Sequence, residues 1–169
     1  MAARLDAIDL RILEELQRDS SRTNVRLARA VGLSAPACLR RVRRLRASGA
    51  IRREMAVLDP KVAGLHMAVL AGVVLDRESR ELIAAFKQRM QEDPAVAQCW
   101  YVTGQFDFLV LVRIRDIAQY EALGQRLFHG DPNVKRYESL VVLDEVKHEL
   151  AVPIAGLPES NGPQRRAGT

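Results

Sequence analysis

Apolar residues recur every three or four positions through the first third of the chain, which is the period of an amphipathic helix. The pattern predicts helices over 6–17, from 23 or 24 to 31, and from 34 to about 47. Gly32 ends the second helix shortly before the third begins, and Gly49 closes the third. Two helices joined by so short a turn are typical of a helix-turn-helix unit.

After residue 65 the pattern changes to apolar strands separated by helices. The predicted elements are strands over 67–75, 96–102, 106–114 and 134–146 and helices over 78–92 and 117–128. The resulting order β-α-β-β-α-β is that of a ferredoxin-like sheet. One face of such a sheet carries the helices. The other face is also apolar here, so we expect it to pack on another subunit.

These elements predict an α+β protein with two domains. A helix-turn-helix domain covers 1–58, and the strand-prone run 50–58 at its end is compatible with a winged variant. A turn-rich linker covers 59–65, and a ferredoxin-like βαββαβ domain covers 66–155. Residues 156–169 are rich in Gly, Pro and Arg and show no periodicity, so we expect a disordered tail there.

The positive charge of the chain is concentrated in the first predicted domain. Residues 1–60 carry 13 basic and 7 acidic side chains, whereas residues 61–169 carry 13 basic and 14 acidic ones. A basic domain joined to a near-neutral one suggests a polyanion, such as duplex DNA, as partner of the first domain. The alternative is a basic surface that is merely solvated. No apolar run approaches the roughly 18 residues of a membrane span, so we expect no membrane partner and a cytoplasmic location.

The sequence offers little for catalysis. Cys38 and Cys99 stand 61 positions apart and are most simply small buried hydrophobes. His66, His129 and His148 are scattered without metal-ligand spacing, and the sequence holds no glycine-rich phosphate-binding pattern. We therefore expect no enzyme activity, no cofactor and no metal site.

The predicted third helix has one apolar face and one cationic face. Its arginines fall largely opposite an apolar stripe of Cys38, Val42 and Leu45, so the helix could enter the major groove of DNA. The candidate DNA contacts are Ser34, Ala35, Ala37, Arg40, Arg41 and Arg44. Arg40 and Arg41 are expected nearest the DNA and Arg44 at a phosphate.

Two further arginines of this helix have another candidate role. Arg43 and Arg46 are the arginines that could pair with acids of the first helix instead of DNA. The alternative for each cationic side chain is that it only solvates the helix.

The predicted turn at 103–105 lies between two strands and has a glycine at its centre. Gly104 permits a positive φ and close approach of a ligand to the backbone. Exposed N–H groups there could hold a carboxylate and Asp107 could face an ammonium group, which together fit an α-amino acid. The alternatives are a plain hairpin glycine and a turn-capping acid.

Several motifs, in order and at matching spacing, resemble the Lrp/AsnC (feast/famine) transcription regulators. The resemblance runs from about Leu5 to Pro153. Its motifs are the opening Leu5-Asp6-x-x-Asp9-x-x-Ile12-Leu13, the helix-turn-helix through 33–51, the run Val102-Thr103-Gly104-Gln105-Phe106-Asp107 and the run Asp144-Glu145-Val146-Lys147.

The resemblance implies an N-terminal DNA-binding domain and a C-terminal domain that both oligomerises and binds a small effector, usually an amino acid. Members typically form dimers that assemble further, often to octamers. The implied effector site comprises Tyr101, Val102, Thr103, Gly104, Gln105, Phe106, Asp107, Ser139 and Leu140. Glu54 stands where many members carry an aromatic residue, so the effector and the target genes stay open.

Three functions compete on this basis. The first is a sequence-specific transcriptional regulator that responds to a small effector. The second is a non-specific architectural DNA-binding protein of the same fold, which would show little preference among sequences. The third is a ferredoxin-like enzyme or storage protein with an incidental basic domain, which would not bind DNA at moderate salt.

Overall fold

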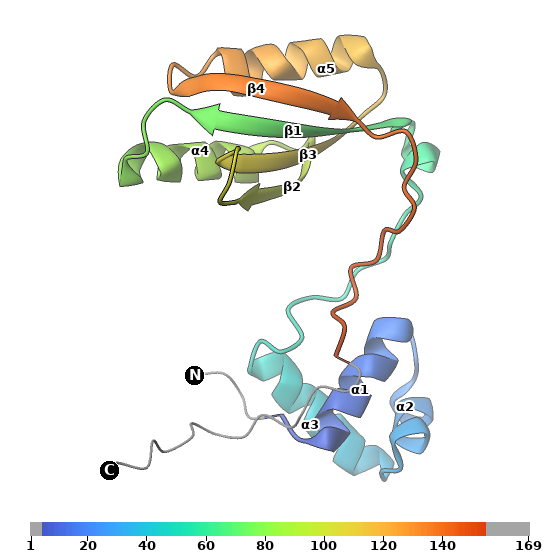
Figure 1. Ribbon diagram of the computed structural model, residues 1–169. Coiled ribbons are helices and arrows are strands. Elements are labelled where there is room, and N and C mark those ends of the chain that lie inside the picture. The colour runs from blue at the N-terminus through green and yellow to red at the C-terminus, as the bar shows by residue number, and fades with distance from the viewer. Residues whose placement is uncertain (1–4, 155–169) are drawn as a thin grey trace, which may run out of the picture. The chain divides into compact units, whose positions relative to one another are not determined.

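Residues 5–154 are described by the computed structural model, and their elements are drawn in Figure 1. The helices are α1 (Ala7–Arg18), α2 (Asn24–Val31), α3 (Ala35–Ala47), η1 (Pro60–Ala63), α4 (Arg80–Glu92), α5 (Ile117–Gly124) and η2 (Gln125–His129). The strands are β1 (Met67–Leu75), β2 (Val96–Tyr101), β3 (Phe108–Ile114) and β4 (Val134–Val141). The described residues form two units, one of residues 5–56 with 149–154, and one of residues 57–148.

The first unit is a three-helix cluster around an aliphatic core. Its buried residues come from all three helices and are Ile12, Leu27, Ala28, Val31, Cys38, Val42 and Leu45. The Thr23 hydroxyl caps α2, and Gly32 ends that helix with a φ of 73°, a conformation that glycine adopts without strain. The predicted helix-turn-helix is confirmed.

The second unit is a four-stranded antiparallel sheet with the order β2-β3-β1-β4. In its register Val69 faces Val112 and Ala71 faces Val110, and all four side chains are fully buried. Helices α4 and α5 cover this face, since Phe86 and Leu123 belong to the same core. The predicted ferredoxin-like plan is therefore confirmed.

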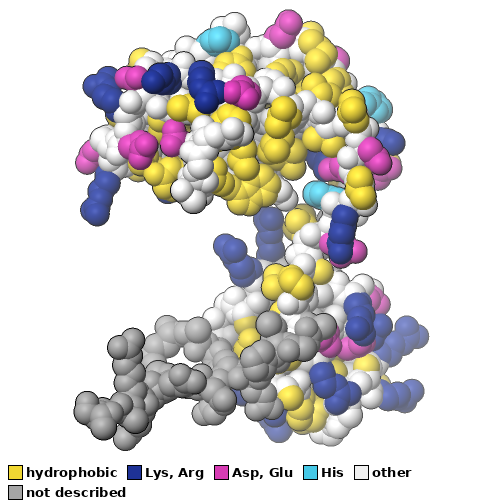
Figure 2. Space-filling model, viewed as in Figure 1, with side chains coloured by type: hydrophobic (Ala, Val, Ile, Leu, Met, Phe, Trp, Pro, Cys, Tyr) yellow, Lys and Arg dark blue, Asp and Glu magenta, His cyan; other side chains and the backbone are white. Residues whose placement is uncertain are grey.

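The opposite face of the sheet carries no helix of the unit. Leu70 pairs with Leu111 on one side and with Leu140 on the other, so the three side chains share this face. Trp100 and Leu140 on it remain 45% and 54% exposed. Figure 2 shows hydrophobic side chains gathered on the surface of this unit.

Two predictions of local structure are wrong. The run 50–58 forms no strand, so the described residues contain no β-wing after α3. The last strand ends at Val141 instead of 146. The Val142 N–H still donates to the Ala68 carbonyl oxygen, but residues 143–146 have no neighbouring strand to pair with among the described residues.

The chain beyond the sheet returns to the helical unit. The Gln17 amide donates to the Val152 carbonyl oxygen at 3.1 Å, and the Val152 N–H donates to Gln17 Oε1 at 2.6 Å. Residues 149–154 therefore group with the helical unit, whereas the sequence analysis assigned residues up to 155 to the sheet domain. The predicted disordered tail over 156–169 lies outside the described residues.

Candidate DNA interface and effector site

The face of α3 that points away from the core carries two arginines without a partner. Cys38, Val42 and Leu45 fix the buried side of the helix, so Arg40 and Arg43 lie exposed on the other side. Within residues 5–154 neither side chain makes an ion pair or a hydrogen bond. Their guanidinium groups are therefore available to a polyanion.

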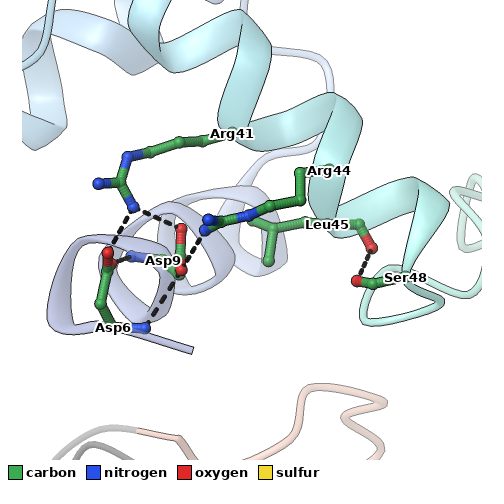
Figure 3. A network of polar contacts seen from close by, with 6 residues as sticks. All are labelled: Asp6, Asp9, Arg41, Arg44, Leu45 and Ser48. Atoms are coloured by element: carbon green, nitrogen blue, oxygen red, sulfur yellow. Dashed lines mark hydrogen bonds and ion pairs between the residues drawn. The ribbon is translucent and has the colours of Figure 1, made fainter. Parts of the chain in front are cut away.

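Figure 3 shows that two other arginines of α3 reach back to α1. Arg41 Nη1 bridges Asp6 Oδ2 at 2.6 Å and Asp9 Oδ1 at 2.9 Å. Arg44 Nη2 lies 2.5 Å from Asp9 Oδ2. Asp6 and Asp9 also close a capping box at the start of α1, because each side chain accepts the backbone N–H of the other.

These contacts set the ionisation of the first turn. Burial acts to raise the pKa of Asp6, but the hydrogen bonds from Arg41 and from the Asp9 N–H outweigh it, so the pKa lies below its usual value. The hydrogen bonds to Asp6 and Asp9 also raise the pKa of Arg41. Asp6 and Arg41 are therefore both ionised at neutral pH.

The expectation that Arg43 and Arg46 pair with acids of the first helix is wrong. Arg41 and Arg44 make those pairs, and Arg46 instead contacts Glu54 at 2.7 Å. The reason is the direction in which each side chain leaves α3. Only a residue beside the buried stripe, on the side that faces α1, can reach the acids of α1. The pairing leaves Arg41 only 27% exposed, whereas Arg44 remains 53% exposed.

One signal for this network was visible in the sequence. Asp9 lies four residues after Leu5 and three before Ile12, so it falls on the apolar stripe of α1. A carboxylate on a buried stripe requires a cationic partner, because an unpaired buried charge is costly. Asp9 is indeed fully buried, which identifies it as a residue that the sequence reasoning missed.

The N-terminal end of α3 is open. Ser34 is the N-cap residue, but its hydroxyl makes no capping hydrogen bond and is exposed. The Ala35 carbonyl accepts a hydrogen bond from the Asn24 side chain at 2.8 Å, which ties this end to α2. Ala37 is half-buried, whereas Ser34 is exposed. Ser34 is therefore the candidate DNA contact with an accessible polar side chain at this end of the helix.

The turn between β2 and β3 has the backbone that the sequence predicted. Gly104 has a φ of 131°, and the N–H groups of Thr103 and Gln105 meet no acceptor within residues 5–154. Asp107 anchors the turn, because its Oδ2 accepts the Leu75 N–H at 2.7 Å. Asp107 therefore has a structural partner already, and only its second carboxylate oxygen is open.

The other candidate effector residues do not converge on this turn. Tyr101 packs on Phe108 on the helix-covered face, and the Ser139 hydroxyl lies 2.5 Å from that of Tyr120 on α5. Leu140 lies on the opposite face. Phe106 also belongs to that open face, since its ring covers Gly72.

A hollow of about 350 Å³ lies at the other end of the sheet from this turn. It is framed by η1, the start of β1 and the segment after β4, and charges of both signs line it: Lys61 and Arg113 are basic, and Asp59, Asp144 and Glu145 are acidic. None of the candidate effector residues lines it. The unit thus offers two places where a small polar molecule could bind.

Models of two protein domain families match the chain, one in each of these units. The AsnC-type helix-turn-helix domain matches residues 5–46, and the Lrp/AsnC ligand binding domain matches residues 68–152. The chain belongs to the Lrp/AsnC family of transcription regulators. In this chain, α3 is the second helix of the helix-turn-helix, and the sheet unit corresponds to the ligand-binding domain.

Relatives cover nearly the whole chain. A leucine-responsive regulatory protein of Rhizobium meliloti is 37% identical over 150 residues, which is 89% of this chain and 96% of the relative. A glutamate uptake regulatory protein of Zymomonas mobilis is 31% identical over 166 residues, 98% of this chain and 99% of its own. A Neisseria meningitidis regulator solved with L-Met has a TM-score of 0.84 at 29% identity, covering 89% of this chain and 97% of its own.

These relatives are named as regulators and not as enzymes. Among residues 5–154, no group of three or more His, Cys, Asp or Glu side chains could hold a metal ion. In the same part of the chain, no helix is long and apolar enough to cross a membrane.

Proposed function

We propose that this family member is a sequence-specific transcriptional regulator that binds duplex DNA through α3 and responds to an amino acid. The observation that supports DNA binding best is that Arg40 and Arg43 lie on the exposed face of that helix with no partner within residues 5–154. A helix of this kind reads base edges in the major groove, and arginine is suited to guanine and to phosphate. Because its target is DNA, the protein would act in the cytoplasm.

Within this proposal the α3 residues divide by role. Arg40 and Arg43 contact the DNA, Arg44 reaches a phosphate with the donors that Asp9 leaves free, and Ser34 meets the backbone. Ala35 and Ala37 allow the start of the helix to approach closely. Arg41, which the sequence placed nearest the DNA, is directed toward α1.

An amino-acid effector is supported by two observations. The sheet unit matches the ligand-binding domain of the family, and one structural neighbour was solved with L-Met. The names of the relatives refer to a response to leucine and to the uptake of glutamate, so they do not point to one amino acid for this chain. We place the effector at the turn 102–107, where free N–H groups would hold its carboxylate.

Assembly into dimers, and of dimers into larger oligomers such as octamers, is part of the proposal. The apolar face with Leu70, Leu111 and Leu140 would be covered by the same face of a second copy. A second candidate function, non-specific architectural binding, is favoured only by the high density of arginine on α3.

The deciding experiment measures affinity for duplexes selected by the protein from random DNA, and for unselected duplex of equal length. A specific regulator prefers the selected duplex by about 10³-fold or more, and one amino acid changes its affinity. A ratio near one without any amino-acid effect would establish the architectural alternative. Arg40→Ala should weaken DNA binding, whereas Arg115→Ala in the sheet unit should not.

Calorimetric titration with the common amino acids locates the effector. Asp107→Ala and Gly104→Val should weaken binding if the turn is the site, because both disturb its backbone. Binding that survives both changes but is lost in Lys61→Ala would place the effector in the hollow instead.

A further inference from the structure

The carboxylate of Asp9 accepts more hydrogen bonds than any other side chain among the described residues of the helical unit. It accepts the Asp6 N–H at 3.2 Å, Arg41 Nη1 at 2.9 Å and Arg44 Nη2 at 2.5 Å, and its side chain has no exposed surface. Two of these three donors belong to α3. Asp9 therefore joins the first helix to the helix that carries the exposed arginines (Figure 3).

We propose that Asp9 and Arg41 are positioning residues for DNA reading, which act by fixing the rotation of α3 and not by touching DNA. The inference rests on the proposed DNA-binding function. It assigns α1 a part in sequence specificity, because the orientation of Arg40 and Arg43 depends on an acid of another helix.

The first support is that apolar packing alone leaves rotation weakly defined. Cys38, Val42 and Leu45 hold α3 to the core, but hydrophobic contact has no preferred direction. Charge-assisted hydrogen bonds are short and directional. Arg41 and Arg44 lie one turn apart on α3 and meet the two oxygens of one fixed carboxylate, which defines both the rotation and the tilt of the helix.

The second support is that Arg41 is not free to bind a phosphate. Its Nη1 serves two carboxylates at once, and its side chain is only 27% exposed. Removing it from Asp9 would leave a fully buried carboxylate with one cation in place of two. Arg44 is 53% exposed and has donors to spare, so it can keep Asp9 and still reach a phosphate.

The test uses the change in DNA affinity of Asp9→Asn, because an electrostatic effect and a positioning effect predict opposite signs for it. Asp9→Asn removes a negative charge close to the DNA-binding face, and electrostatics alone would strengthen binding to any duplex. Loss of positioning instead weakens binding only where base edges are read. We expect affinity for selected duplex to fall at least tenfold, while affinity for unselected duplex stays within about twofold of the wild type.

Arg41→Ala should give the same pattern. If Arg41 neutralised a phosphate, both affinities would fall together, and the slope of log K against log salt would decrease in magnitude by about 0.9. An unchanged salt slope with a reduced preference supports positioning. A reduced slope, or an increase of both affinities in Asp9→Asn, would overturn it.

Misfolding has its own signature, because a partly unfolded sample loses both affinities by the same factor. If the first variants misfold, two milder variants can still test the positioning role. Asp6→Asn changes the exposed partner of Arg41 and leaves the bonds to Asp9, and Arg41→Lys keeps one donor for Asp9. Recovery of sequence preference in Arg41→Lys relative to Arg41→Ala supports positioning, and equal loss in both contradicts it.

A different result would contradict the proposed function itself. If the wild-type chain selects no sequence from random DNA, regulation by specific binding is wrong whatever the variants do. If it selects a sequence and Asp9→Asn selects it equally well, only the positioning role is wrong. Arg115→Ala, which changes an exposed charge of the sheet unit, serves as the matched control throughout.

Discussion

At the scale of single residues, arginines of one helix have different roles because their neighbours differ. Arg40 and Arg43 are exposed and unpaired within the described residues, whereas Arg41 is bound to Asp6 and Asp9. The sequence identified the helix and its cationic side. It did not identify which arginines face outward, because that depends on where α1 lies beside α3.

The lowered pKa of Asp6 predicts a loss of stability in acid. A carboxyl whose pKa is depressed by folding stabilises the protein above its usual pKa, and this contribution is lost as the pH falls through the folded value. The free energy of unfolding should therefore fall more steeply below about pH 4 in the wild type than in Asp6→Asn. Urea unfolding at several pH values between 7 and 3 measures this difference.

Glu14→Gln is a suitable control for this measurement. Glu14 lies on the same helix and makes no ion pair within residues 5–154. Because Asp6 is 48% exposed, its contribution at pH 7 should stay below about 1 kcal/mol. Identical pH profiles for the wild type and Asp6→Asn would contradict the assignment.

Gly72 is required by the ring of Phe106. A Cβ at this position would stand 2.8 Å from three ring carbons of Phe106, which is closer than carbon atoms approach without displacement. Gly72→Ala should therefore destabilise the sheet unit by about 1–3 kcal/mol, as overpacking does. Chemical unfolding measures the change, and Phe106→Leu in the same chain should recover part of it. A stabilised Gly72→Ala would show that the ring moves freely.

At the scale of elements, period and capping residues were enough to place most helices and strands. In the structure, Val69, Ala71 and Val73 and the alternating residues of β3 form the buried side of the sheet. The expected wing failed because a strand-prone run needs a partner strand, and 50–58 has none within the described chain. The effector set failed to converge because Ser139 and Leu140 are adjacent, and adjacent strand residues point to opposite faces.

The link between α1 and the residues after the sheet is another element that the sequence did not reveal. Both hydrogen bonds of this link use the Gln17 amide and the backbone of Val152, which are separated by 135 positions. Gln17→Ala should cost about 1 kcal/mol of local stability and raise the hydrogen-exchange rate of the Val152 amide. The Val31 amide, in the core of the same unit, should exchange as before. Unchanged exchange at Val152 would show that this link does not persist in solution.

At the scale of the whole molecule, the open sheet face is the surface through which we propose that copies of the chain assemble. Leu140 is 54% exposed on this face, opposite Leu70. Leu140→Glu would place a charge in the proposed dimer contact, so we expect the dissociation constant of the dimer to rise at least tenfold. Sedimentation equilibrium measures the change.

Val62→Glu is the matched control for assembly. Val62 is 87% exposed on η1 and does not belong to the sheet, so a charge there should leave the dimer intact. Equal dissociation of both variants would mean that charge in general, and not this face, governs assembly. The sequence predicted the apolar face, but the area of the contact depends on a partner that one chain does not contain.

The buried carboxylate of Asp9 also bears on how such regulators could be redirected to new genes. Grafting residues 34–48 from a relative without a basic residue at position 41 would leave Asp9 short of a cation inside the protein. A functional transplant must therefore carry the relative's own residues at positions 6 and 9 together with the borrowed helix. In this chain the unit that can be exchanged is the pair α1 and α3, and not the reading helix alone.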